Sequence, residues 1–94
     1  MGKLIRILGK NYRLIQTQEP TTHGETTFID STIAINSNLQ LDSKQETLLH
    51  EIIEVLNYNA ELKLKHNQIS SISSLLYSVI KDNDILDNKL FDEF

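Results

Sequence analysis

The first third of the chain alternates apolar and polar residues in short runs, a pattern typical of β-strands. Residues 3–8 and 11–18 flank a turn at Gly9, which predicts a β-hairpin. Residues 26–29 and 32–35 are rich in β-branched side chains and are separated by two turn-forming residues, which predicts a second hairpin. We therefore expect a small antiparallel sheet made of two N-terminal hairpins.

After residue 40 the apolar positions recur every three or four residues, which is the period of an amphipathic helix. The first predicted helix covers residues 47–59. Its start can be capped by Asp42 or Ser43, and Glu46 follows Ser43 at the spacing of a capping box. The apolar positions expected to face the sheet are Leu48, Leu49, Ile52, Ile53, Val55 and Leu56.

A second helix is predicted over residues 67–82, with Asn67 as its cap. Its expected buried stripe consists of Ile69, Ile72, Leu76 and Val79, widened by Leu75 and Ile80. Strands followed by two helices indicate an α+β domain in which the helices pack on one face of the sheet. Residues 1–83 form this single domain, and residues 84–94 are an acidic tail expected to be flexible.

Composition and charge narrow the functional classes. Ninety-four residues with 39% apolar content suffice for one domain with a small core. The net charge of −4 and the lack of a basic stripe argue against a nucleic-acid partner, because contacts to phosphate supply most of that affinity. No targeting signal is recognisable, and no apolar run reaches the roughly 20 residues of a membrane span. We expect a cytoplasmic protein without a membrane partner.

The first predicted helix carries the string His50-Glu51-Ile52-Ile53-Glu54. His50 and Glu54 are four residues apart, so both side chains project from one side of a helix and can reach a common metal ion. Since the chain has no cysteine, its metal ligands can only be histidine and carboxylate. Glu51 is placed to act as a general base, as in the His-Glu-x-x-His helix of zinc peptidases. The same spacing also fits a solvated pair on a polar helix face, so both interpretations stay open.

The surroundings of this string resemble a known layout. Residues 24–36 have the form of a hairpin ending in Ile-Ala-Ile-Asn, and about ten residues later Thr-Leu-Leu-His-Glu-Ile-Ile-Glu begins at residue 47. Over about residues 24–83 the chain resembles the small phage- and prophage-encoded relatives of the ImmA/IrrE-type metallopeptidase domains, most clearly in residues 47–54 and 75–83. The resemblance implies a minimal zincin-like fold and a divalent metal, zinc in the first instance.

The chain also departs from that family pattern. Glu54 stands where the family has its second histidine, which keeps a ligand but adds a negative charge that weakens the Lewis acidity of a metal. The family takes an acidic third ligand from the next helix, whereas the matching residues 70–74 contain no acid. His66, just before that helix, is the best substitute. His23 lies in a loop and is expected to be an exposed residue.

Two functions follow from the resemblance and its departures. The first is a degenerate zincin-like domain, located in the host cytoplasm, that acts as a binding or inhibitor module for a host or phage protein, with the tail at residues 84–94 as a docking segment. Its metal site, if retained, consists of His50, Glu54 and His66. The alternative is an active zinc-dependent peptidase with Glu51 as general base, in which strand 32–36 lies at the sheet edge and aligns an extended substrate.

Overall fold

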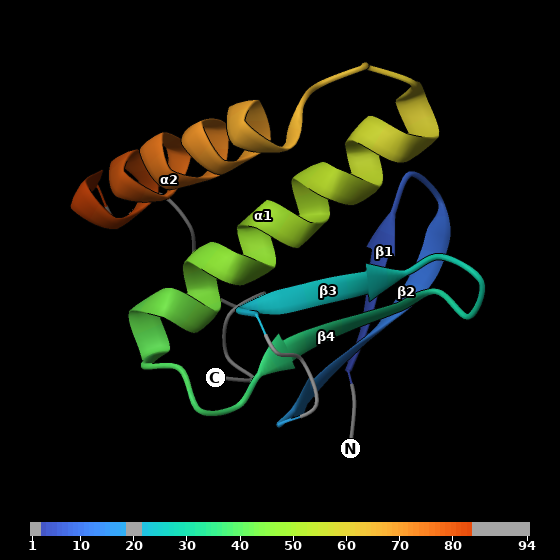
Figure 1. The fold of residues 1–94 in the computed structure, drawn as a ribbon, viewed down its shortest axis with the longest axis horizontal. Coiled ribbons are helices and arrows are strands. Elements are labelled where there is room, and N and C mark those ends of the chain that lie inside the picture. Colours follow the sequence, from blue (N-terminus) through green and yellow to red (C-terminus); the bar gives the residue numbers. More distant parts are fainter. Residues whose placement is uncertain (1–2, 19–21, 84–94) are drawn as a thin grey trace.

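The computed structural model describes residues 3–18 and 22–83, and within these ranges the chain forms four strands and two helices. The predicted order, strands first and then two helices, is confirmed (Figure 1). The predicted tail at residues 84–94 lies outside the described residues. The elements are β1 (Lys3–Ile7), β2 (Lys10–Thr17), β3 (Gly24–Thr27), β4 (Thr32–Asn36), α1 (Leu41–Ala60) and α2 (His66–Asn83).

The strands form one sheet in the order β1-β2-β4-β3. Both predicted hairpins are present, since β1 pairs antiparallel with β2 and β3 pairs antiparallel with β4. Between the hairpins, however, β2 and β4 are parallel, with Leu14 opposite Ile33. After β2 the chain forms β3 at the sheet edge and then reverses to form β4 between β2 and β3. Strand β4 therefore runs in the same direction as β2. The sheet is therefore mixed, and the expectation of a wholly antiparallel sheet is wrong at this junction.

The edge strand differs from the one expected. Residues 32–36 form β4, which lies between β2 and β3 with a hydrogen-bonded neighbour on each side. Among the strands of residues 3–18 and 22–83, the outermost on this side of the sheet is β3. Any extended ligand that pairs with this edge must therefore pair with residues 24–27 rather than with residues 32–36.

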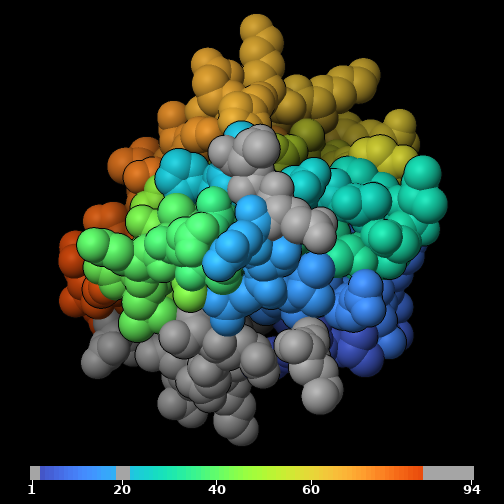
Figure 2. Space-filling view, turned by 60° about the horizontal axis from the view of Figure 1, so that its bottom comes forward, coloured from blue at the N-terminus to red at the C-terminus, as the bar shows by residue number. Residues whose placement is uncertain are grey.

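The main core lies between one face of the sheet and α1. Side chains alternate along a strand, so every second residue of β1, β2 and β4 points to the same face. In the space-filling view the strand residues occupy the middle and α2, coloured orange to red, is seen only at the margin (Figure 2). The buried residues of this core are Ile5, Ile7, Tyr12, Leu14, Ile33, Ile35, Leu48 and Val55.

Helix α1 begins earlier than the cap pattern predicts. Its first residue is Leu41, its N-cap is Gln40, and no side chain caps it. The backbone N–H of Lys44 already donates to the carbonyl of Gln40, so Ser43 lies within the first turn and cannot be the cap. The predictions of Asp42 or Ser43 as the cap, and of a capping box from Ser43 and Glu46, are therefore wrong.

Helix α2 packs on α1 and buries a different stripe from the one predicted. Its buried residues are Ile69, Ser73 and Tyr77, whereas Ile72, Leu75, Leu76 and Val79 are exposed. Among the described elements, α2 has substantial contact with α1 alone, and one helix covers only a narrow stripe of another. Within residues 3–18 and 22–83, neither helix is long and apolar enough to cross a bilayer.

Polar contacts fix the direction of α2 against α1. The hydroxyl of Tyr77 donates to the side-chain oxygen of Gln45, and the ammonium of Lys81 donates to Asp42. The C-terminal part of α2 thus lies beside the start of α1, and the two helices are antiparallel (Figure 1). The N-terminal residue of α2, His66, is consequently placed beside the middle of α1.

Gly24, the first residue of β3, packs too closely on its neighbours to carry a side chain. A Cβ at this position would lie 2.8 Å from Cγ2 of Thr47 and 2.9 Å from the carbonyl oxygen of Ala34. We expect Gly24→Ala to lower the free energy of unfolding by about 1–3 kcal/mol through overpacking, measured by urea denaturation. In a Thr47→Ser background the same change should cost less, because one of the two clashing atoms is gone. An equal cost in both backgrounds would contradict the clash with Thr47.

Candidate metal centre

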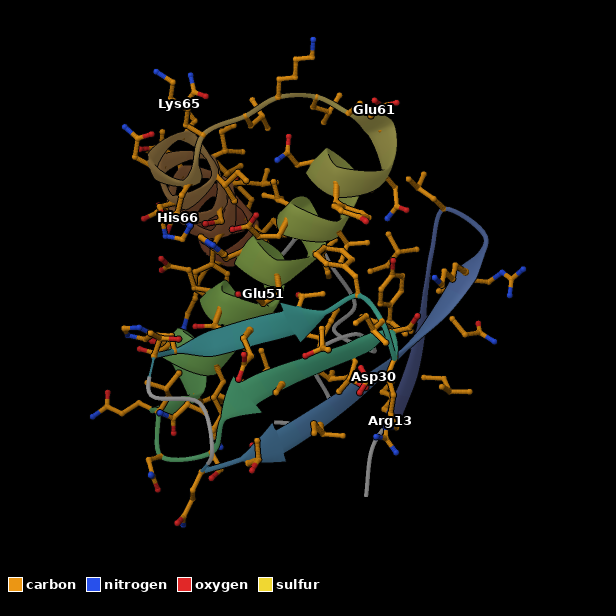
Figure 3. The ribbon with its side chains drawn as sticks, turned by 45° about the vertical axis from the view of Figure 1, so that its right-hand side comes forward. Arg13, Asp30, Glu51, Glu61, Lys65 and His66 are labelled. Atoms are coloured by element: carbon orange, nitrogen blue, oxygen red, sulfur yellow. The ribbon has the colours of Figure 1, made fainter. Side chains whose placement is uncertain are left out.

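One face of α1 carries a continuous row of polar side chains. Their spacing of three and four residues places them on the same side of the helix over three turns. Near its middle this row faces β3 and the start of α2 (Figure 3). The row consists of Ser43, Glu46, Thr47, His50, Glu51 and Glu54.

A pocket of about 340 Å³ opens along this row. Its walls come from three parts of the chain: the start of β3 with the two residues before it, helix α1, and the first half of α2. The lining residues are Thr22, His23, Gly24, Ser43, Glu46, Thr47, His50, Glu51, His66, Ser70 and Ser73.

Beside this pocket, three side chains meet around one carboxylate oxygen. Oε2 of Glu54 lies 3.2 Å from Nε2 of His50 and 3.3 Å from Nδ1 of His66. The pair on α1 is local, at the i and i+4 positions, whereas His66 is brought in by the packing of α2. The potential ligand atoms of all three residues lie within 4.8 Å of one another. The structure thus brings together the three metal ligands expected from the sequence.

These separations suit a tetrahedral zinc ion. With Zn–N and Zn–O bonds of about 2.0–2.1 Å, two ligands of a tetrahedron lie roughly 3.3 Å apart. The two distances that involve Glu54 already have this value, so the remaining adjustment is an approach of the two imidazoles. The ring centroids of His50 and His66 are 5.0 Å apart, and the side chain of His66 is 77% exposed. Two imidazoles and one carboxylate are a common zinc ligand set, with a fourth position left open.

The charge of the cluster also favours a cation. As ligands of a metal, the two imidazoles would be neutral and Glu54 ionised, so the three would carry −1 and a divalent ion would change this to +1. His50 is only 15% exposed and Glu54 29% exposed, so their interaction with an ion is screened less than on an open surface. The donor types, their separations and their charge therefore all fit a divalent transition metal.

Glu51 lies on the pocket side of α1 toward β3 and is buried (Figure 3). The hydroxyl of Thr26 donates to Oε1 of Glu51 at 2.7 Å. Burial raises the pKa of Glu51 above its usual value, and the hydrogen bond from Thr26 opposes this effect. A carboxyl group that keeps a proton more readily, in a pocket next to the His50, Glu54 and His66 group, has the properties of a general acid or base.

The raised pKa predicts how Glu51→Gln affects the metal-free protein. The unfolded chain loses the Glu51 proton at a lower pH than the folded chain, so this group lowers the free energy of unfolding as pH rises above the ordinary glutamate value. Glutamine keeps an oxygen acceptor for Thr26 and has no charge to bury. We expect the variant to be more stable than the native chain at about pH 8 and similar to it at about pH 4, measured by urea denaturation. If Glu51→Gln raised the free energy of unfolding equally at both pH values, the raised pKa of Glu51 would not be the cause.

Three further residues of the pocket region are His23, Glu46 and Thr26, and they differ in how well the sequence predicted their places. His23 lines the pocket, is exposed as expected, and is not part of the three-residue cluster. Glu46 was predicted as a capping residue, although its helical spacing from His50 already indicated a place on the same face. Thr26 had no recognisable signal, because its contact with Glu51 joins residues 25 positions apart.

Comparisons with protein-family models, curated proteins and solved structures found no match to this chain.

Proposed function

We propose that this chain is a degenerate zincin-like domain that binds one zinc ion and uses the neighbouring pocket to hold a segment of a host or phage protein. His50, Glu54 and His66 are the proposed ligands. The observation that carries this proposal is the shared Oε2 of Glu54, which lies at zinc-ligand separations from both imidazoles. Three protein ligands would leave one coordination position for a donor atom of the bound protein.

Zinc titration of the metal-free protein tests the metal centre. We expect one equivalent of zinc to bind and to raise the thermal unfolding temperature, since a ligand that prefers the folded state stabilises it. His50→Ala should abolish the zinc-dependent shift, and His23→Ala should retain it, because His23 lines the pocket outside the cluster. If zinc produced no shift in the native protein, the cluster would be an ion-pair network that links α2 to α1.

A second candidate function, a zinc-dependent peptidase, is favoured by the position of Glu51. Bound zinc would act as a Lewis acid toward a peptide carbonyl. The oxygen of Glu51 that does not accept from Thr26 would take a proton from the attacking water and pass it to the leaving amine. The negative charge of Glu54 reduces the Lewis acidity available for this reaction. For this reason a binding module is the first proposal and a peptidase the second.

Glu51→Gln separates the two candidates. In a binding module this variant should leave zinc affinity unchanged within about twofold, because Glu51 is not one of the three ligands. In a peptidase it should abolish the cleavage of a peptide library followed by mass spectrometry. Cleavage by the native protein that survives in the variant would exclude Glu51 as the base.

A further inference from the structure

Glu46 is one of the two carboxylates that line the pocket. Its side chain is half-buried and lines the pocket one helical turn before His50. Among residues 3–18 and 22–83, its carboxylate makes no hydrogen bond or ion pair. Every other acidic side chain of the site has one: Glu51 accepts from Thr26, and Glu54 interacts with His50 and His66. A half-buried carboxylate without a partner favours a positively charged neighbour.

The other walls of the pocket do not supply that positive charge. The described lining residues include two carboxylates, three histidines and small hydroxyl side chains, but no lysine and no arginine. With zinc bound, the ion and its three ligands would carry +1, whereas the carboxylate of Glu46 would place a negative charge at the other end of the pocket. The pocket is therefore polarised along α1, with the metal at one end and Glu46 at the other.

We propose that Glu46 selects a cationic group of a bound peptide, such as a basic side chain or a free amino terminus. This inference rests on the proposed role of the pocket as a peptide-binding site. Glu46 precedes His50 by four residues, which corresponds to about 6 Å along the helix axis. A lysine side chain can span this distance, so a peptide that places a carbonyl near the metal can place an ammonium group on Glu46. Ser43 and Thr22, both on the pocket wall, can accept hydrogen bonds from the same group.

Three short peptides test the proposal and distinguish the source of the charge. The first is a tetrapeptide blocked at both ends with one lysine among alanines. The second replaces that lysine with glutamine, and the third is tetraalanine amide with a free amino terminus. Each is titrated by calorimetry or NMR into the protein, with and without zinc, at low and at physiological salt.

We expect the lysine peptide to bind about tenfold more tightly than the glutamine peptide, the effect of one hydrogen bond between charged groups. Glu46→Gln should remove this difference and leave zinc affinity unchanged within about twofold, because Glu46 is not one of the three proposed ligands. Glu25→Gln, on the exposed side of β3, is the matched control and should keep it. If tetraalanine amide rather than the lysine peptide shows the Glu46-dependent gain, the cationic group is the amino terminus.

If the native protein bound all three peptides with equal affinity, or bound none of them, the role of Glu46 would be overturned. Zinc binding by the same protein would still support the metal centre. Conversely, a protein that binds no zinc would overturn the metal centre. The peptide titrations without zinc would then still decide the role of Glu46.

Discussion

Glu54→Ala is expected to weaken zinc binding by more than about 100-fold, because loss of a residue that only supports a ligand already costs about 10–100-fold. Glu54 is the centre of the cluster, since both imidazoles contact the same carboxylate oxygen. Its removal takes away the single negative charge among the three ligands and leaves two imidazoles on different helices without a common partner. We expect a larger loss here than for His66→Ala, whose side chain is mostly exposed.

Competition with a chromophoric chelator measures this loss directly. Glu46→Gln is the matched control, because it removes a carboxylate from the same face of α1 outside the cluster. Glu54→His provides a further comparison: it keeps a ligand and removes the negative charge, so it should restore most of the zinc affinity. Zinc affinity unchanged in Glu54→Ala would show that the ion, if any, binds elsewhere.

Ile69→Ala is expected to lower the free energy of unfolding by about 2–5 kcal/mol, the usual cost of truncating a buried aliphatic side chain. Ile69 is 1% exposed and packs with Leu49, Ile53 and Tyr77 between the two helices. Leu75 is on the same helix but 69% exposed, so Leu75→Ala should change stability by no more than about 0.5 kcal/mol.

Urea denaturation followed by circular dichroism distinguishes these two effects. The sequence predicts both Ile69 and Leu75 on the buried side of the second helix, whereas the structure buries only Ile69. The two variants therefore test which side of α2 is buried. If Leu75→Ala were as damaging as Ile69→Ala, helix α2 would be rotated so that its wider apolar side faces a neighbour. A small effect of Leu75→Ala together with a large effect of Ile69→Ala would support the packing described above.

Local patterns predicted most of the fold. Alternation and helical spacing identified the four strands, the two hairpins and both helices, because each depends on residues close in sequence. Three features depend on how distant elements dock and were not predictable in this way. These are the parallel pairing of β2 with β4, the edge position of β3, and the face that α2 turns to α1.

In the candidate site, too, the contacts between residues close in sequence were predictable, and most contacts between distant elements were not. His50 and Glu54 were found from their four-residue spacing, and the structure places them 3.2 Å apart. His66 was chosen as the remaining nearby histidine, and the packing of α2 brings it to Glu54. Thr26 could not be found, since its contact with Glu51 requires β3 to lie against α1. Glu46 was assigned to a cap because the true start of α1, at Leu41, has no side-chain signal.

The division of the ligands between two helices bears on the order of folding. His50 and Glu54 need one formed turn of α1, whereas His66 contributes after α2 has docked. On the proposed assignment, zinc would also bind weakly to the denatured ensemble, and this binding would subtract from the stabilisation expected for a ligand of the native state alone. If α1 forms in the folding transition state, zinc will accelerate refolding through its first two ligands, and His66 will act mainly by slowing unfolding. Stopped-flow refolding of the native protein and of His66→Ala, with and without zinc, would resolve these two contributions.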